Sequence, residues 1–218
     1  MPAGAERDAS FRLDAPGTYY YWGAVTDSAL NRRLGPESQL TGAIVVDDPA
    51  APVPSDRVFV ITEWMDTAWP AAIPLDRLFV AAINGRSWPH TERLRHALGD
   101  PVHWRWINTS HAAHPLHLHG FYYRVDARGD IRRDTQLPAT ARPRVVPERV
   151  PVGGTMTMSW APERPGNWSF HCHVPRPLHP HLPLDGTTPA TRHAGHAANH
   201  ALEGMAGLVL GIEVTGEA

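Results

Sequence analysis

The chain has 218 residues, of which 42% are apolar, enough for one domain with a core or for one domain and part of another. Its 20 basic residues are all arginine and are balanced by 22 carboxylates, so neither a nucleic-acid partner nor a polybasic membrane anchor is expected. No apolar run approaches the roughly 20 residues of a membrane span. The first ten residues lack the basic end and apolar stretch of a signal peptide, so we expect a soluble chain without an export signal.

Short runs rich in β-branched and aromatic residues recur along the chain between proline, glycine and aspartate residues. Their length and spacing are typical of strands rather than helices. In chain order they cover 18–22, 43–47, 57–64, 77–83, 102–108, 121–125, 148–152, 155–161, 167–173 and 206–214. These runs predict an all-β sandwich.

One segment has a helical pattern. Residues 91–98 place Leu94 and Leu98 four positions apart, and Gly99 follows as a stop signal. We therefore expect a short helix or turn between two strands.

Two segments have the composition of connections. The proline-rich stretch between Val46 and Arg57 predicts an extended linker, with a domain boundary near residue 55. Residues 174–199 are rich in proline, glycine, threonine and histidine and have no period, which predicts a long irregular loop.

Histidine is unevenly distributed along the chain. None of the 14 precedes His90, four lie between His111 and His119, and seven lie between His171 and His200. The single cysteine, Cys172, excludes an internal disulfide and lies within the second group. Because randomly placed surface histidines would not avoid the first 89 positions, we interpret both groups as metal ligands.

The first group has the sequence HAAHPLHLHGF. On a strand, His117 and His119 point to the same face and can clamp a metal ion together, while Leu118 points to the other face. Pro115 favours an extended backbone at His114, which would aim that imidazole at a different point. The alternative is a pair of solvated histidines on a polar strand face.

The second group has the sequence NWSFHCHV. The same alternation places His171 and His173 on one face and Cys172 on the other, so one strand end could contact two metal sites. A thiolate with imidazoles and a weak thioether is the ligand set of a blue-copper centre, while all-imidazole sets suit copper that binds dioxygen. The alternative is a buried structural cysteine flanked by surface histidines.

The motifs HPLHLHG and HCH resemble the two C-terminal copper motifs of the multicopper oxidases, the family of laccases. The resemblance extends over most of residues 57–218 and implies a cupredoxin-like Greek-key β-sandwich over 56–218. The runs APGTYYYWG and LTGAIVVD are similar to the last strands of a preceding cupredoxin-like domain, which would place residues 1–55 in a partial domain and linker.

The resemblance also implies a role for each residue of the two motifs. His114 and Cys172 would bind the type 1 copper, and His117 the type 2 copper. His119, His171 and His173 would bind the type 3 pair. Cys172, His171 and His173 would form the catalytic path for electrons between the copper sites.

The sequence departs from the family pattern after HCH. Pro177 stands where the family has its second type 1 histidine, and proline cannot bind a metal. His179 or His200 could replace it. We favour His200, because it precedes Met205 by the family's spacing to the axial ligand, with 174–199 as an insertion. On its own, Met205 would be read as a core methionine.

A second departure concerns the trinuclear copper cluster. The family takes further HxH pairs from a different domain, but Trp22, Gly23 and Ala24 stand where HSH is common. The missing ligands would come from an oligomer or from an N-terminal domain absent from this chain, or the cluster would be degenerate.

The resemblance implies an oxidoreductase that takes single electrons from a small-molecule or metal-ion reductant at type 1 copper and passes them to dioxygen. It also implies a periplasmic or extracellular location. The first alternative is a cupredoxin-like electron-transfer protein without oxidase activity, because trinuclear ligands are missing. A zinc-binding structural domain is the second alternative.

Overall fold

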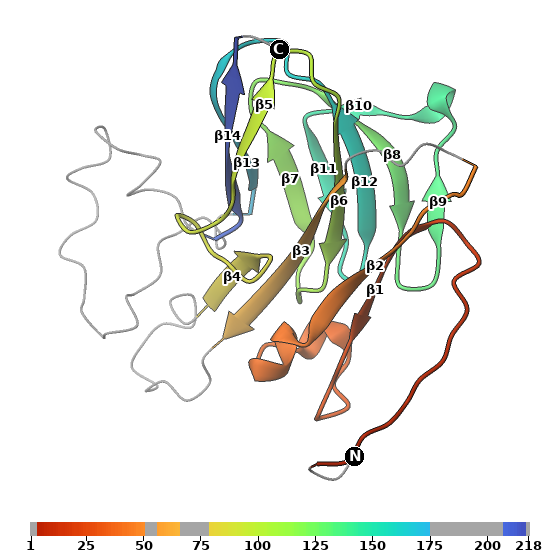
Figure 1. Cartoon of the computed structure of the whole chain (residues 1–218). Coiled ribbons are helices and arrows are strands. Elements are labelled where there is room, and N and C mark those ends of the chain that lie inside the picture. Colours follow the sequence, from red (N-terminus) through yellow and green to blue (C-terminus); the bar gives the residue numbers. More distant parts are fainter. Residues whose placement is uncertain (1–3, 51–55, 66–78, 175–206, 217–218) are drawn as a thin grey trace, which may run out of the picture.

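The computed structural model describes residues 4–50, 56–65, 79–174 and 207–216, and within them it is built almost entirely from strands (Figure 1). The strands are β1 (Gly17–Trp22), β2 (Thr41–Val46), β3 (Asp56–Met65), β4 (Phe79–Ile83), β5 (Arg93–Ala97), β6 (Val102–Asn108), β7 (His114–Leu118), β8 (Tyr123–Gly129), β9 (Asp134–Gln136), β10 (Arg144–Val145), β11 (Pro147–Val150), β12 (Thr155–Trp160), β13 (Gly166–Cys172) and β14 (Val209–Thr215). Short 3-10 helices are η1 (Leu30–Arg32), η2 (Pro36–Gln39) and η4 (Ala139–Ala141). The predicted all-β class is confirmed.

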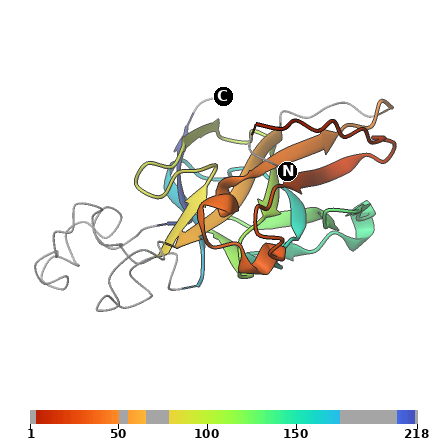
Figure 2. The ribbon, with the colours of Figure 1, turned by 90° about the horizontal axis from the view of Figure 1, so that it is seen from below.

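Two sheets form the sandwich. The larger has the order β10-β8-β12-β6-β3-β4, with β9 paired to β8, and the smaller has the order β11-β7-β13-β14-β5. Strands β1 and β2 pair only with each other, and the view from below shows this hairpin beside the larger sheet (Figure 2).

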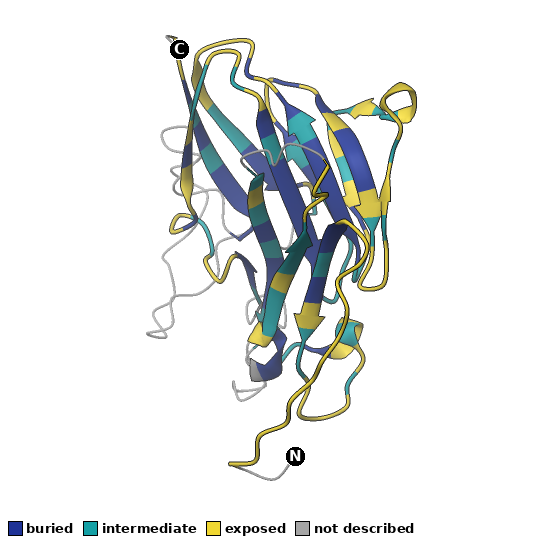
Figure 3. Ribbon diagram, turned by 45° about the vertical axis from the view of Figure 1, so that its right-hand side comes forward, coloured by how far each residue is buried: buried dark blue, intermediate teal, exposed yellow. Residues whose placement is uncertain are grey.

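Aromatic side chains fill the space between the sheets. Trp106 of β6 is fully buried and stacks on Phe59 of the same sheet, with ring centroids 4.7 Å apart. It also stacks on Phe170 of the smaller sheet at 4.8 Å. The strands at the centre of both sheets are accordingly the most buried parts of the molecule (Figure 3).

Strand β1 lies against β6 and β12 on the outer face of the larger sheet. Arg105 donates a hydrogen bond to the Thr18 hydroxyl at 2.9 Å and pairs with Asp56 at 2.5 Å. Because both faces of β6 are covered, six of its seven residues are buried, without the alternation of a half-exposed strand.

The prediction of a short helix or turn over 91–98 is wrong. Residues Arg93–Ala97 form β5, an edge strand that runs parallel to β14. Leu94 points into the core, whereas Leu98 lies past the strand end and is 38% exposed. A helix of about eight residues is marginal without packing on one face, and pairing with β14 satisfies the same backbone groups. Gly99 still ends the element, with φ +83° in the following turn.

The division of the chain near residue 55 stays a prediction. Residues 51–55 and most of the expected loop over 174–199 lie outside the described residues.

Replacing Trp106 by alanine is expected to lower the free energy of unfolding by about 3–5 kcal/mol. The substitution would leave a cavity in a close-packed core, between the rings of Phe59 and Phe170 on which Trp106 stacks. Urea denaturation followed by circular dichroism measures the change. Val25→Ala, at a side chain that is 82% exposed, is the control and should change stability by less than about 0.5 kcal/mol. A similar effect of both variants would contradict this description of the core.

Candidate metal centre

Strands β7 and β13 run antiparallel and carry both histidine motifs. Their register places His171 directly opposite His117, and Cys172 opposite Leu116. Because side chains alternate along a strand, His114, Leu116 and Cys172 all face the core. The imidazoles of His117 and His171 share the outer face of the smaller sheet.

The inner group joins His114 and Cys172, both fully buried. His114 Nδ1 lies 3.3 Å from Cys172 Sγ, and the Val174 amide donates to the same sulfur at 3.3 Å. Burial raises the pKa of the Cys172 thiol to about 11, so without a metal it carries its proton at neutral pH. A bound cation would replace that proton, since metals bind the thiolate.

The outer group brings four imidazoles together. The ring centroid of His117 lies 4.4 Å from that of His173, 4.6 Å from that of His119 and 5.5 Å from that of His171. The donor nitrogens of His117, His171 and His173 lie within 4.8 Å of one another, and Nε2 of His119 lies 2.7 Å from Nε2 of His171. This convergence is what a metal cluster with imidazole ligands needs.

Burial favours the neutral, metal-binding form at three of these four rings. It lowers the pKa of His117 to about 4, with further lowering by the neighbouring imidazoles, and it also lowers the pKa of His119 and His171. His117 Nδ1 is buried and accepts no hydrogen bond from the described residues. A buried nitrogen without a hydrogen-bond partner, on a ring that three other imidazoles surround, fits a cation.

Cys172 connects the two groups through its main chain. The Nδ1 atom of His171 lies 2.9 Å from the Cys172 carbonyl oxygen, which can only accept, so Nδ1 carries the proton. That hydrogen bond leaves Nε2 of His171 facing the outer cluster. A short covalent and hydrogen-bonded path therefore joins the Cys172 sulfur to an outer imidazole.

Sequence reasoning missed three polar residues around His114. Glu63 of β3 is 1% exposed and contacts both His111 and His114. Ser110 and Asn108, also buried, extend this network. Glu63 carried a signal in the sequence, because it continues the inward-facing positions of Phe59 and Ile61 on one strand.

Other predicted ligands cannot be placed. His200, Met205, His179 and the proline at 177 all lie outside the described residues. The choice between His200 and His179 therefore stays a prediction. Gly120, which follows His119, has φ +80°, and a Cβ there would meet the Trp168 ring at 2.4 Å.

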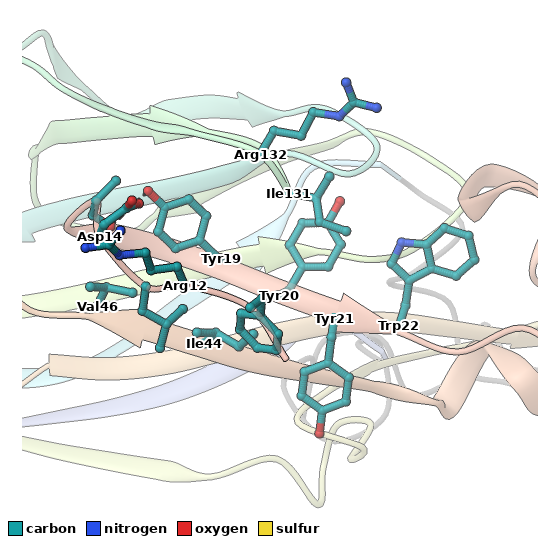
Figure 4. Close-up of a pocket in the computed structure, with 13 residues that line it drawn as sticks. Arg12, Asp14, Tyr19, Tyr20, Tyr21, Trp22, Ile44, Val46, Ile131 and Arg132 are labelled. Carbon is teal, nitrogen blue, oxygen red and sulfur yellow. Dashed lines mark hydrogen bonds between the residues drawn. The ribbon is translucent and has the colours of Figure 1, made fainter. Parts of the chain in front are cut away.

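A separate cavity of about 400 Å³ lies along β1 and β2, under the segment before β1 (Figure 4). Its walls include Tyr19, Tyr21, Ile44 and Arg132. It shares no lining residue with either the inner or the outer group, so it is not part of the candidate metal centre.

The sequence profile of the multicopper oxidases matches residues 52–182, which include both histidine motifs. The chain belongs to the multicopper oxidase family. The match agrees with the resemblance found in HPLHLHG and HCH.

Comparison with similar proteins shows what share of each relative's length this chain covers. Laccase-7 of Arabidopsis thaliana is 37% identical over 67 residues, 28% of this chain and 12% of the laccase. Oxidoreductase OpS5 of Beauveria bassiana is 28% identical over 118 residues, 51% of this chain and 19% of its own. The blue copper oxidase of Nitrosomonas europaea has a TM-score of 0.66 at 20% identity, covering 94% of this chain and 57% of that one. The structural match confirms the cupredoxin-like fold, and the chain spans less than two thirds of the length of each of these relatives.

Copper fits the residues of both groups. A buried thiolate beside an imidazole is a soft ligand pair that copper prefers, and the outer group offers only imidazole nitrogens.

None of the helices in the described part of the chain has the length and hydropathy of a membrane-spanning segment.

Proposed function

We propose that the chain is the copper-carrying C-terminal part of a multicopper oxidase, which takes single electrons from a small-molecule or metal-ion reductant and delivers them to dioxygen. The observation that carries this proposal is the position of Cys172, whose side chain meets His114 in the core while its carbonyl holds His171 of the outer cluster. Copper bound at these residues would supply one-electron redox chemistry.

Each group of residues has its own task in this proposal. His114 and Cys172 hold the type 1 ion, completed by His200 and Met205. His117 binds the type 2 ion, and His119, His171 and His173 bind the type 3 pair. Leu116, which lies opposite Cys172 on β7, and Phe170 belong to the same buried core cluster as Cys172, and this apolar surrounding keeps water from the thiolate.

The domain arrangement forms part of the same proposal. Residues 56–218 would be the C-terminal cupredoxin domain and residues 1–55 the last strands of a preceding domain with its linker. Histidines from an oligomeric partner or from an N-terminal domain would complete the outer cluster. The proposal includes a periplasmic or extracellular location, which the resemblance to the multicopper oxidases implies.

The alternative function, an electron-transfer protein with one copper ion, is favoured by the small number of outer ligands. Four described imidazoles face the outer cluster, whereas three copper ions ordinarily need two or three nitrogen donors each. In that protein only the inner group would bind copper and transfer electrons.

Metal analysis of the copper-loaded protein, with visible and electron paramagnetic resonance spectra, separates the two functions. We expect an intense copper–thiolate band together with more than one copper ion per chain. One copper ion with that band would favour the electron-transfer protein. Tightly held zinc without any band would contradict both functions.

A further inference from the structure

The imidazole of His114 must present a particular nitrogen to Cys172 for the inner group to bind a metal. Its Nδ1 faces the Cys172 sulfur at 3.3 Å. A nitrogen binds a metal through its lone pair, so the proton of the neutral ring has to lie on Nε2. The groups that surround Nε2 therefore determine whether the proton lies on Nε2 and leaves the Nδ1 lone pair available to a metal.

The hydroxyl of Ser110 is the nearest neighbour of that nitrogen, with Oγ 2.8 Å from Nε2. Oγ also lies 2.6 Å from Oδ1 of Asn108 and 3.0 Å from the Ala112 carbonyl oxygen, both of which can only accept. The single hydroxyl proton must point to one of these oxygens. If that proton pointed to His114 instead, Ser110 Oγ and Asn108 Oδ1 would face each other at 2.6 Å without a proton between them, which is unfavourable because both oxygens carry lone pairs.

The side-chain amide of Asn108 cannot rotate to relieve this constraint. Its Nδ2 donates to the carbonyl oxygens of Ala112, Val150 and Pro151 at 2.8, 3.1 and 3.0 Å. Its Oδ1 accepts from the Ser110 amide at 3.0 Å. A flipped amide would place an oxygen against three carbonyl oxygens, so the backbone fixes which atom faces Ser110.

Glu63 adds a second acceptor beside the same nitrogen. Its Oε1 lies 3.5 Å from His114 Nε2, while its Oε2 contacts His111 Nδ1 and accepts from the His111 amide at 3.2 Å. The carboxylate is 1% exposed. It therefore faces His114 from a fixed position on β3.

We propose that Asn108, Ser110 and Glu63 are positioning residues that hold His114 with its proton on Nε2 and its Nδ1 lone pair toward Cys172 before any metal binds. This inference rests on the proposed ligand role of His114 and Cys172. A ring held in this way loses little conformational freedom when a metal arrives, so metal affinity rises.

The first test needs no metal. In the metal-free protein with ¹⁵N-labelled histidine, nuclear magnetic resonance reports which ring nitrogen carries the proton, and the His114 signals are identified by their loss in His114→Gln. We expect a protonated Nε2 and an unprotonated Nδ1. A proton on Nδ1 in the wild-type protein would overturn the proposal, whether or not any variant folds.

The second test compares variants. Ser110→Ala removes the nearest acceptor, and we expect a detectable population with the proton on Nδ1 and a loss of about 10–100-fold in Co²⁺ affinity, measured by titrating the cobalt–thiolate band. Glu63→Gln keeps the shape of the side chain and should have a smaller effect, and combining both changes should give the largest. Ser159→Ala, on β12 away from the network, is the matched control and should bind Co²⁺ like the wild type.

The two tests separate this role from the proposed function. A wild-type protein without a cobalt–thiolate band would contradict the proposed ligand set. A band that is present and keeps its affinity in Ser110→Ala, with the proton still on Nε2, would contradict only the positioning role.

Discussion

Cys172→Ser is expected to remove all copper–thiolate absorption from the copper-loaded protein. The chain contains a single cysteine, so no other thiolate can replace it. Serine oxygen is a harder donor than sulfur and does not give the charge-transfer band of a copper–thiolate bond. The variant should also lose one bound copper ion per chain, while the outer imidazoles keep their share.

The control variant for this experiment is a substitution on the same strand, β13. Ser169→Ala changes a half-buried position three residues before Cys172 and should leave both the band and the copper content unchanged. Far-ultraviolet circular dichroism of the two variants checks that β13 remains folded. If Cys172→Ser kept any of the band, the inner site would be wrongly assigned.

The arrangement of the two histidine motifs could be predicted from the sequence because strand alternation is a local property. In HCH, neighbouring side chains must point to opposite faces, and the structure places Cys172 in the core and His171 on the outer face. The pairing of His171 with His117 depends on strand register. Register is set by long-range packing, which the motifs alone do not specify.

The same reasoning failed over residues 91–98 because the pattern there is ambiguous. Leu94 and Leu98 fit one face of a helix, but a single inward leucine also fits a short edge strand. The free edge of β14, which comes over 100 residues later, decides between them. The residues of 91–98 contain no information about that pairing partner, so a strand could not be predicted from them alone.

The neighbours of His114 were missed for a different reason. Ser110 lies four residues before His114 and could be taken for an ordinary loop residue, and Asn108 is the last residue of β6. Their importance comes from three backbone carbonyls, two of them about 40 residues away. Glu63 could have been suspected as a carboxylate on an inward-facing strand position, where an ionised group is costly without partners.

The copper-loaded chain by itself is expected to reduce dioxygen no faster than its His171→Ala variant. Four imidazoles share the outer cluster, and they cannot give each of three copper ions two or three nitrogen donors. Metal affinity falls when ligands are absent. His173 is also exposed, so its ring lacks the buried support that His114 has.

Oxygen uptake with a phenolic or metal-ion reductant measures this, and size-exclusion chromatography gives the oligomeric state of the same sample. A second copy of the chain could add only the histidines that the sequence contains, none of which precedes His90. His179 and His181 form the one further HxH pair outside the two motifs, and they lie outside the described residues. Multiple turnovers that stop in the double variant His179→Ala, His181→Ala would mean that this pair completes the cluster. Turnover that survives both that variant and His171→Ala would show that the outer imidazoles are not the site of dioxygen reduction.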